Sequence, residues 1–199
     1  MSGAFPISTA KFQSLGIKSI QNTIISKSVS GKKLARQIDG QRWGFTARII
    51  TAKRSDVYGE LMAFIIKQRS GKENFTIIPP EVEDARGTAS GTPNGTGSAG
   101  ATSITLGGTG TGTLKAGDFI KFANHNKVYM VVADQSDIST GSLTIEPPLT
   151  TAVSSSDITY DNVPFTVYLT NDIQEFGVVG ADKDGNLLYQ FEFDVEEAL

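Results

Sequence analysis

The chain has 199 residues, of which 39% are hydrophobic, so it can bury the core of one large or two small domains. It has no cysteine and one histidine, His125, which excludes disulfides, a Cys nucleophile and any metal site built from several Cys or His side chains. Residues 1–80 hold 13 Lys and Arg against 4 Asp and Glu, whereas residues 81–199 hold 5 against 17. Such asymmetry is typical of nucleic-acid binding by the basic part, or of charge complementarity within one fold or between copies.

Residues 42–49 are the first segment with a clear strand pattern. Apolar side chains alternate with basic or small ones along it: Trp43, Phe45, Ala47 and Ile49 against Arg42, Gly44, Thr46 and Arg48. A period of two predicts a strand with one face in the core and one basic face.

A helix is predicted over residues 55–70, and it is the only convincing helical pattern in the sequence. Ser55 can cap its N-terminus, and Asp56 lies in the first turn, where the helix dipole favours negative charge. Apolar residues then recur at helical spacing, and Gly71 can end the helix.

Two strands that each end in a pair of prolines, at Pro79-Pro80 and Pro147-Pro148, bracket a segment of different character. This segment contains short β-rich runs joined by polar turns. We therefore expect residues 81–157 to form a small antiparallel barrel or sandwich, inserted into a discontinuous β domain of residues 1–80 and 158–199.

The inserted segment opens with nine glycines between Gly87 and Gly112. A phosphate-binding P-loop needs a Lys followed by Ser or Thr directly after its last glycine, at the start of a helix. Here Gly112 is followed by Thr113 and Leu114, and no helical pattern comes after them. We interpret the stretch as a solvated, flexible loop rather than a nucleotide site.

The C-terminal residues predict a hairpin with a turn at Asp184-Gly185 and a long last strand. Apolar residues occupy one face of this strand and acidic residues, Glu192, Asp194 and Glu196, occupy the other. This acidic strand and the basic strand of residues 42–49 either pair with each other or each face a neighbouring copy.

Other candidate sites favour plain structural interpretations. His125 lies in a turn between two strands, where a solvated histidine is expected; a hydrolase would need it beside Asp118 or Asp134. The carboxylates of residues 81–84 lie in a linker beside prolines, and the Asp182 region is a hairpin tip that lacks the final bidentate Glu of a calcium loop. No catalytic, cofactor or metal residue is therefore predicted.

Seven basic residues could bind phosphate groups: Lys32, Lys33, Arg36, Arg42, Arg48, Lys53 and Arg54. A platform for stacking nucleic-acid bases needs exposed aromatic side chains, whereas the only aromatics among these basic residues, Trp43 and Phe45, fall on the core face. An electrostatic protein interface fits better, with Lys32, Lys33, Arg36, Arg42 and Arg48 opposite Glu192, Asp194 and Glu196.

Two parts of the chain resemble the distal tail proteins of tailed bacteriophages, including the short lambda-type form. The resemblance covers residues 15–80 and 160–199. It rests on the element Gln41-Arg42-Trp43, the helix followed by Gly71, the strand from Phe75 to Pro80, and the closing stretch "LLYQFEFDVEEAL".

The resemblance implies a tail-tube-like β-sandwich or split barrel with one flanking helix, and a structural role without catalysis. Such a protein would be made in the host cytoplasm and form a hexameric ring in the virion, joining the tail tube to the hub or tip of the baseplate. The inserted domain would project outward and could hold peripheral fibres. The alternative is a β module that binds carbohydrate or the host surface, which needs exposed aromatics such as Tyr129 or Tyr168.

Overall fold

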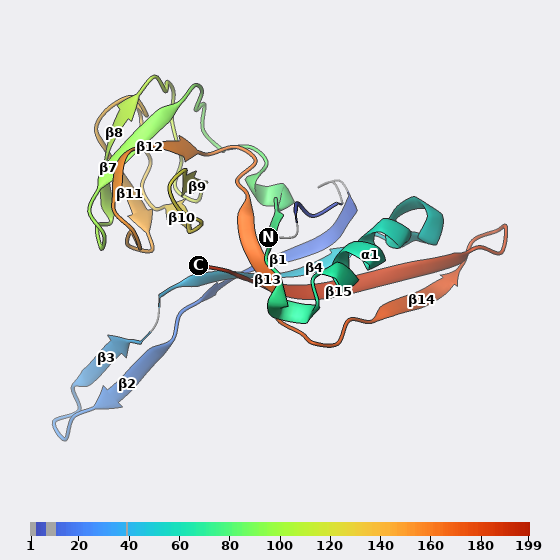
Figure 1. Cartoon of the computed structure of the whole chain (residues 1–199). Helices are drawn as coiled ribbons and strands as arrows, with labels where there is room; N and C mark the ends of the chain where they lie inside the picture. The colour runs from blue at the N-terminus through green and yellow to red at the C-terminus, as the bar shows by residue number, and fades with distance from the viewer. Residues whose placement is uncertain (1–2, 7–10, 39) are drawn as a thin grey trace.

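The computed structural model describes residues 3–6, 11–38 and 40–199, and within them the protein is mainly β with one α-helix (Figure 1). The strands form three groups: a large sheet, a closed barrel and a separate two-stranded sheet. The predicted mainly β class, with one helix and a small antiparallel barrel, is confirmed. None of the helices in this described part is long and apolar enough to cross a membrane.

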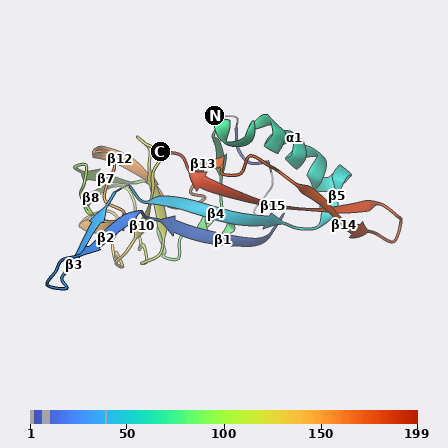
Figure 2. The same cartoon turned by 90° about the horizontal axis from the view of Figure 1, so that it is seen from below.

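The large sheet has seven strands, with the central order β1-β4-β15-β13-β6, while β14 and β5 also pair with β15. Its strands are β1 (Phe12–Ile20), β4 (Arg42–Ile49), β5 (Ala52–Lys53), β6 (Phe75–Ile77), β13 (Phe165–Leu169), β14 (Phe176–Ala181) and β15 (Leu187–Glu197). Because β15 is long enough to pair at both ends, all seven strands join one sheet. Figure 2 shows the helix on one side of this sheet, where a sandwich would place a second sheet.

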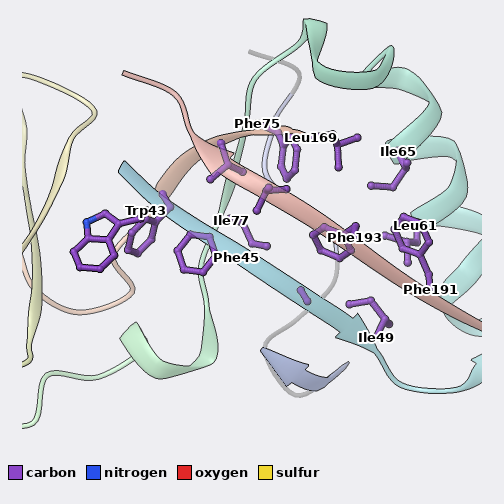
Figure 3. Close-up of a cluster of buried hydrophobic side chains, with 14 of the residues drawn as sticks. Trp43, Phe45, Ile49, Leu61, Ile65, Phe75, Ile77, Leu169, Phe191 and Phe193 are labelled. Atoms are coloured by element: carbon purple, nitrogen blue, oxygen red, sulfur yellow. The ribbon is translucent and has the colours of Figure 1, made fainter. Parts of the chain in front are cut away.

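The core of the large sheet follows the predicted alternation. Trp43, Phe45 and Ile49 of β4 and Phe191 and Phe193 of β15 are all buried, with exposed fractions of 6% or less. They pack with side chains of the helix and of β6 in the cluster drawn in Figure 3. Burial of one face on both central strands confirms the period-two prediction.

The helix differs from its prediction at both ends. A π-helical turn η2 (Arg54–Tyr58) precedes the α-helix α1 (Gly59–Lys67), and the Ser55 hydroxyl donates to Asp56 instead of capping. Tyr58 is fully buried, and its hydroxyl donates to the Ile50 carbonyl at 3.0 Å. The chain leaves the helix through Arg69 and Ser70, both at positive φ, and a short 3₁₀ turn η3 (Ser70–Lys72) follows.

Gly71 has a packing role rather than the predicted helix-ending role. A Cβ at this position would lie 2.6 Å from the carbonyl oxygen of Leu169, so only glycine permits the close approach to β13.

The barrel consists of six strands in the closed order β10-β11-β8-β7-β12-β9. They are β7 (Pro93–Gly97), β8 (Ser103–Gly108), β9 (Phe119–Phe122), β10 (Val128–Val131), β11 (Ser142–Glu146) and β12 (Val153–Thr159). The barrel has a buried cluster of its own, while Phe119 of β9 and Val128 of β10 belong to the cluster of the sheet. A short 3₁₀ turn, η4 (Pro80–Val82), leads into it from β6, and Pro147-Pro148 lies inside it, between β11 and β12.

The glycine-rich stretch is not the solvated loop that its composition suggested. Residues 93–97 and 103–108 form β7 and β8, which pair with each other, and Ser90 and Thr111 form a further bridge. A Cβ on Gly95 would lie 2.7 Å from Phe122 Cε1, and one on Gly110 would lie 2.8 Å from Pro93 Cβ. The glycines therefore allow close packing within a small barrel.

Strands β2 (Thr23–Lys27) and β3 (Lys33–Gln37) form a two-stranded sheet of their own. Ile20, at the end of β1, pairs with Arg42, at the start of β4, so residues 21–38 extend the β1–β4 hairpin beyond the sheet. Figure 1 shows this extension pointing away from the rest of the molecule. We call residues 21–38 the arm.

Candidate interaction surfaces

The charged strands predicted as a candidate interface lie side by side within one chain. Strand β15 is hydrogen-bonded to β4, with Glu192 opposite Arg48 and Glu196 opposite Gly44. Arg42 Nη1 lies 3.0 Å from Glu196 Oε1, and Arg48 Nε lies 3.6 Å from Glu192 Oε2. Of the two arrangements left open by the sequence, the structure therefore has the pairing within the chain.

Asp194 completes this outer face. It accepts a hydrogen bond from the Thr46 hydroxyl, and Lys18 of β1 lies 3.3 Å from its Oδ1. These contacts hold the pKa of Asp194 below its usual range, the Thr46 bond being the largest cause. Each basic residue of β4 has an acidic neighbour on β15, so this face carries little net charge to offer another molecule.

The remaining candidates, Lys32, Lys33 and Arg36, lie on the arm, away from the outer face of the sheet. Every strand residue of the arm is exposed, and Ile24, Ile25 and Leu34 are each more than half exposed. Residues 21–38 contain three Lys and one Arg but no Asp or Glu. The arm is therefore a basic surface that also presents aliphatic side chains.

A buried polar cluster, which the sequence analysis did not predict, joins the barrel to the end of the large sheet. Lys127 lies just before β10. Its Nζ atom is 2.5 Å from Glu197 Oε2 and donates a hydrogen bond to Gln41 Oε1 at 2.7 Å. The Lys127 and Glu197 side chains are 1% and 0% exposed. We call Gln41, Trp43, Lys127, Val128 and Glu197 the junction.

Backbone groups of both parts complete the junction. Glu197 accepts hydrogen bonds from the amides of Trp43, at 3.1 Å, and Val128, at 2.8 Å. The Trp43 indole Nε1 donates to the Val128 carbonyl at 2.9 Å. Burial raises the pKa of Glu197 and lowers that of Lys127, and the attraction between the two opposes both shifts. Glu197 lies on the same face of β15 as Phe193 and Val195, because alternate residues of a strand share a face. This alternation was the sequence signal that could have predicted its burial.

His125 is half-buried rather than solvated. Its Nε2 lies 2.7 Å from the Tyr129 hydroxyl and its Nδ1 2.7 Å from Asn124 Oδ1, so both ring nitrogens are engaged. Burial lowers its pKa. The carboxylates that a hydrolase would need are used elsewhere, since Asp118 accepts from the Arg86 amide and Asp134 from the Ala116 amide. The structure does not bring these groups together as a catalytic site.

A shallow cavity of about 380 Å³ lies beside His125 and is lined by residues of the β9–β10 turn, including Asn124 and Asn126. Two of the aromatics that a sugar-binding face would need are buried, Trp43 at 6% and Tyr129 at 0% exposed, and Tyr168 is half-buried. The cavity is lined mainly by polar residues, and the Phe122 side chain in its lining is itself buried, at 0% exposure.

The two remaining acidic candidates are exposed or locally satisfied. Asp182 lies 2.5 Å from Lys53 and accepts hydrogen bonds from the amides of Asn186 and Asp184 at the hairpin tip; these contacts, the one with Lys53 most of all, lower its pKa. Glu81 and Glu83 are exposed beside η4. Within the described residues no three His, Asp or Glu side chains are grouped so that they could hold a metal ion.

Within the described residues, the protein thus presents a large sheet, a closed barrel and a protruding arm. Residues 81–163 match the family model described as "Distal tail protein pb9, B domain". This match supports assigning the chain to the phage distal tail proteins, structural components of the tail. No curated protein sequence is detectably similar to the chain.

The family match covers the barrel, whereas the resemblance noted from the sequence rested on residues outside it. Two separate parts of the chain therefore point to the same family. The matched range reaches beyond the end of β12 at Thr159, up to the loop before β13.

Proposed function

We propose that this protein is a non-enzymatic ring component of a phage tail, in which six copies join the tail tube to the hub or tip of the baseplate. The observation that carries the proposal is the arm. A two-stranded hairpin is only marginally stable in water by itself, and this one leaves Ile24, Ile25 and Leu34 exposed. A partner that covers these side chains would stabilise the arm, and a ring of identical copies supplies one at every position.

The ring proposal is tested on assembled tails. Cryo-electron microscopy of the tail tip should show a closed ring of this protein between tube and hub. A variant in which a short Gly-Ser turn replaces residues 23–37 should remain folded, because these residues contribute nothing to either buried core. That variant should fail to enter the tail, and its incorporation at the normal level would argue against the proposal.

We further propose that the barrel is a separate inserted domain that projects from the ring and holds peripheral tail proteins. Its closed strand order and its own buried cluster support this division. Joining Pro80 to Asn162 by a short linker removes the barrel and uncovers the Trp43 and Glu197 side chains. Circular dichroism and chemical unfolding should therefore report a folded but less stable sheet, and a molten chain would contradict a separate domain.

The second candidate function is glycan or host-surface binding by the barrel. The polar cavity beside His125 favours it, whereas the burial of Trp43 and Tyr129 does not. A glycan array probed with the whole chain tests it, with an Asn126→Ala variant as control. Binding that Asn126→Ala abolishes would support this candidate.

A further inference from the structure

The arm carries an unfavourable arrangement of charge. Lys27 and Lys33 are directly opposite each other across the two strands, and Lys32 precedes Lys33 in the chain. Like charges at opposed positions of an antiparallel pair are destabilising. An acidic surface placed against the arm would remove this repulsion, so the partner of the arm is expected to be both acidic and apolar.

One surface of this protein has that combination. The hairpin of β14 and β15, with the loop before it, exposes Ile173, Val178, Val179 and Leu187, each more than half exposed. Over residues 172–187 the sequence holds four acidic residues and one Lys. Three of these acids, Asp172, Glu175 and Asp184, are exposed. We call residues 172–187 the acidic hairpin.

The arm and the acidic hairpin lie at opposite ends of the sheet. Strand β15 pairs with Gly44 at Glu196, near the base of the arm, and with Lys53 at Leu188, near the acidic hairpin. These positions are eight residues apart on β15, or roughly 26 Å at about 3.3 Å per residue. Figures 1 and 2 show the two extensions pointing in opposite directions. They cannot meet within one chain, whereas a head-to-tail contact between copies brings them together.

We propose that the arm of one copy docks on the acidic hairpin of the next copy. This inference rests on the ring proposed above and names its contact surface. Ile25 of the arm, which the strand alternation places on the same face as Lys27 and Lys33, would pack against Val178 and Val179, and the Lys27–Lys33 pair would face the carboxylates.

A second exposed acidic group, next to η4, fits less well. Glu81, Glu83 and Asp84 are exposed beside η4, but Val82 between them is buried, at 3% exposure. That group offers charge to the arm but no aliphatic surface. It therefore serves as the matched control in the test.

The test uses the absence of cysteine in the natural chain. Tails are assembled with a double variant, Val29→Cys at the tip of the arm and Val179→Cys on β14, and treated with a short bifunctional maleimide. Denaturing gels should show a ladder that ends at the ring size. The control variants are Val29→Cys with Glu83→Cys, and Val29→Cys alone, and each should stay at least about tenfold less cross-linked.

The outcomes separate this inference from the proposed function. Cross-linking of the arm to position 83, or of two arms to each other, overturns the docking surface but leaves the ring in place. The docking surface is also overturned if electron microscopy shows a ring but the Val29→Cys with Val179→Cys variant gives no ladder. Tails that carry a single copy of the chain contradict both proposals.

A charge exchange gives an independent measurement. Lys27→Glu with Lys33→Glu should lower incorporation into tails at least about tenfold, which corresponds to about 1.4 kcal/mol. Adding Glu175→Lys with Asp184→Lys should restore part of the loss. Restoration by Glu81→Lys with Glu83→Lys instead would overturn the inference.

Discussion

The barrel and the arm leave the same end of the large sheet but are completed in different ways. The barrel closes on itself and is sealed to the sheet by Lys127, Glu197 and Trp43, whose polar atoms find partners within the chain. The arm has two strands, exposed aliphatic side chains and a pair of opposed lysines. A surface whose polar groups are satisfied internally needs no partner, whereas one that exposes apolar and like-charged groups is expected to gain stability from a partner.

The largest effect is expected from breaking the junction. Glu197→Ala leaves Lys127 buried without its carboxylate and removes the acceptor of the Trp43 and Val128 amides. Loss of one partner of a buried ion pair should reduce the free energy of unfolding by about 3–5 kcal/mol. Urea unfolding of the purified chain measures this.

The control for the junction is an ion pair of the outer face. Arg48 and Glu192 are 44% and 56% exposed at 3.6 Å, so Glu192→Ala should cost about 0–1 kcal/mol. Equal losses for Glu197→Ala and Glu192→Ala would mean that the junction does not fasten the barrel to the sheet.

A smaller effect is expected inside the barrel. Gly95→Ala places a methyl group 2.7 Å from Phe122 Cε1 and 2.8 Å from Ile104 Cγ2, and such overpacking costs about 1–3 kcal/mol. Gly180→Ala in β14 is the control, because a Cβ there meets no atom within 4 Å. Thermal unfolding should separate the two variants, and an unchanged melting temperature for Gly95→Ala would disprove the tight packing.

A still smaller, pH-dependent effect is expected at His125. Burial lowers its pKa in the folded state, so the neutral ring is favoured there. The contribution of His125 to the stability of the fold is then fully present above the pKa that it has in the unfolded chain, about 6.5, and decreases as the pH falls below that value. Unfolding at pH 7 and pH 5.5 should show this loss in the natural chain and a weaker one in His125→Gln. The pKa values of Asp182 and Asp194 are lowered, so their contributions to the stability of the fold are lost only under more acidic conditions.

The smallest effect on folding is expected in the arm. Ile25→Glu changes a side chain that is 56% exposed, so the free energy of unfolding of the isolated chain should change by no more than about 0.5 kcal/mol. Incorporation into tails should nevertheless be lost. Ile66→Glu, on the exposed side of α1, controls for added charge. If this variant loses incorporation into tails to the same extent, the arm has no specific role in assembly.

The sequence by itself determined the local features of the fold. The alternation on residues 42–49 and 187–197 fixed which face of each strand is buried, because side chains of a strand point to opposite sides in turn. Helical spacing located α1, although not its ends. The family resemblance also came from these regular segments, which carry enough periodic residues to be compared.

Only the tertiary structure decided how these features meet. The glycine-rich stretch forms strands because Phe122 and Ile104 fill the space that side chains at Gly95 would occupy, and composition contains no information on such distant neighbours. The basic and acidic faces pair with each other because β15 lies beside β4, a register that period-two alternation leaves open. Glu197 becomes a buried partner of Lys127 for the same reason: a contact between residues 70 positions apart depends on the path of the whole chain.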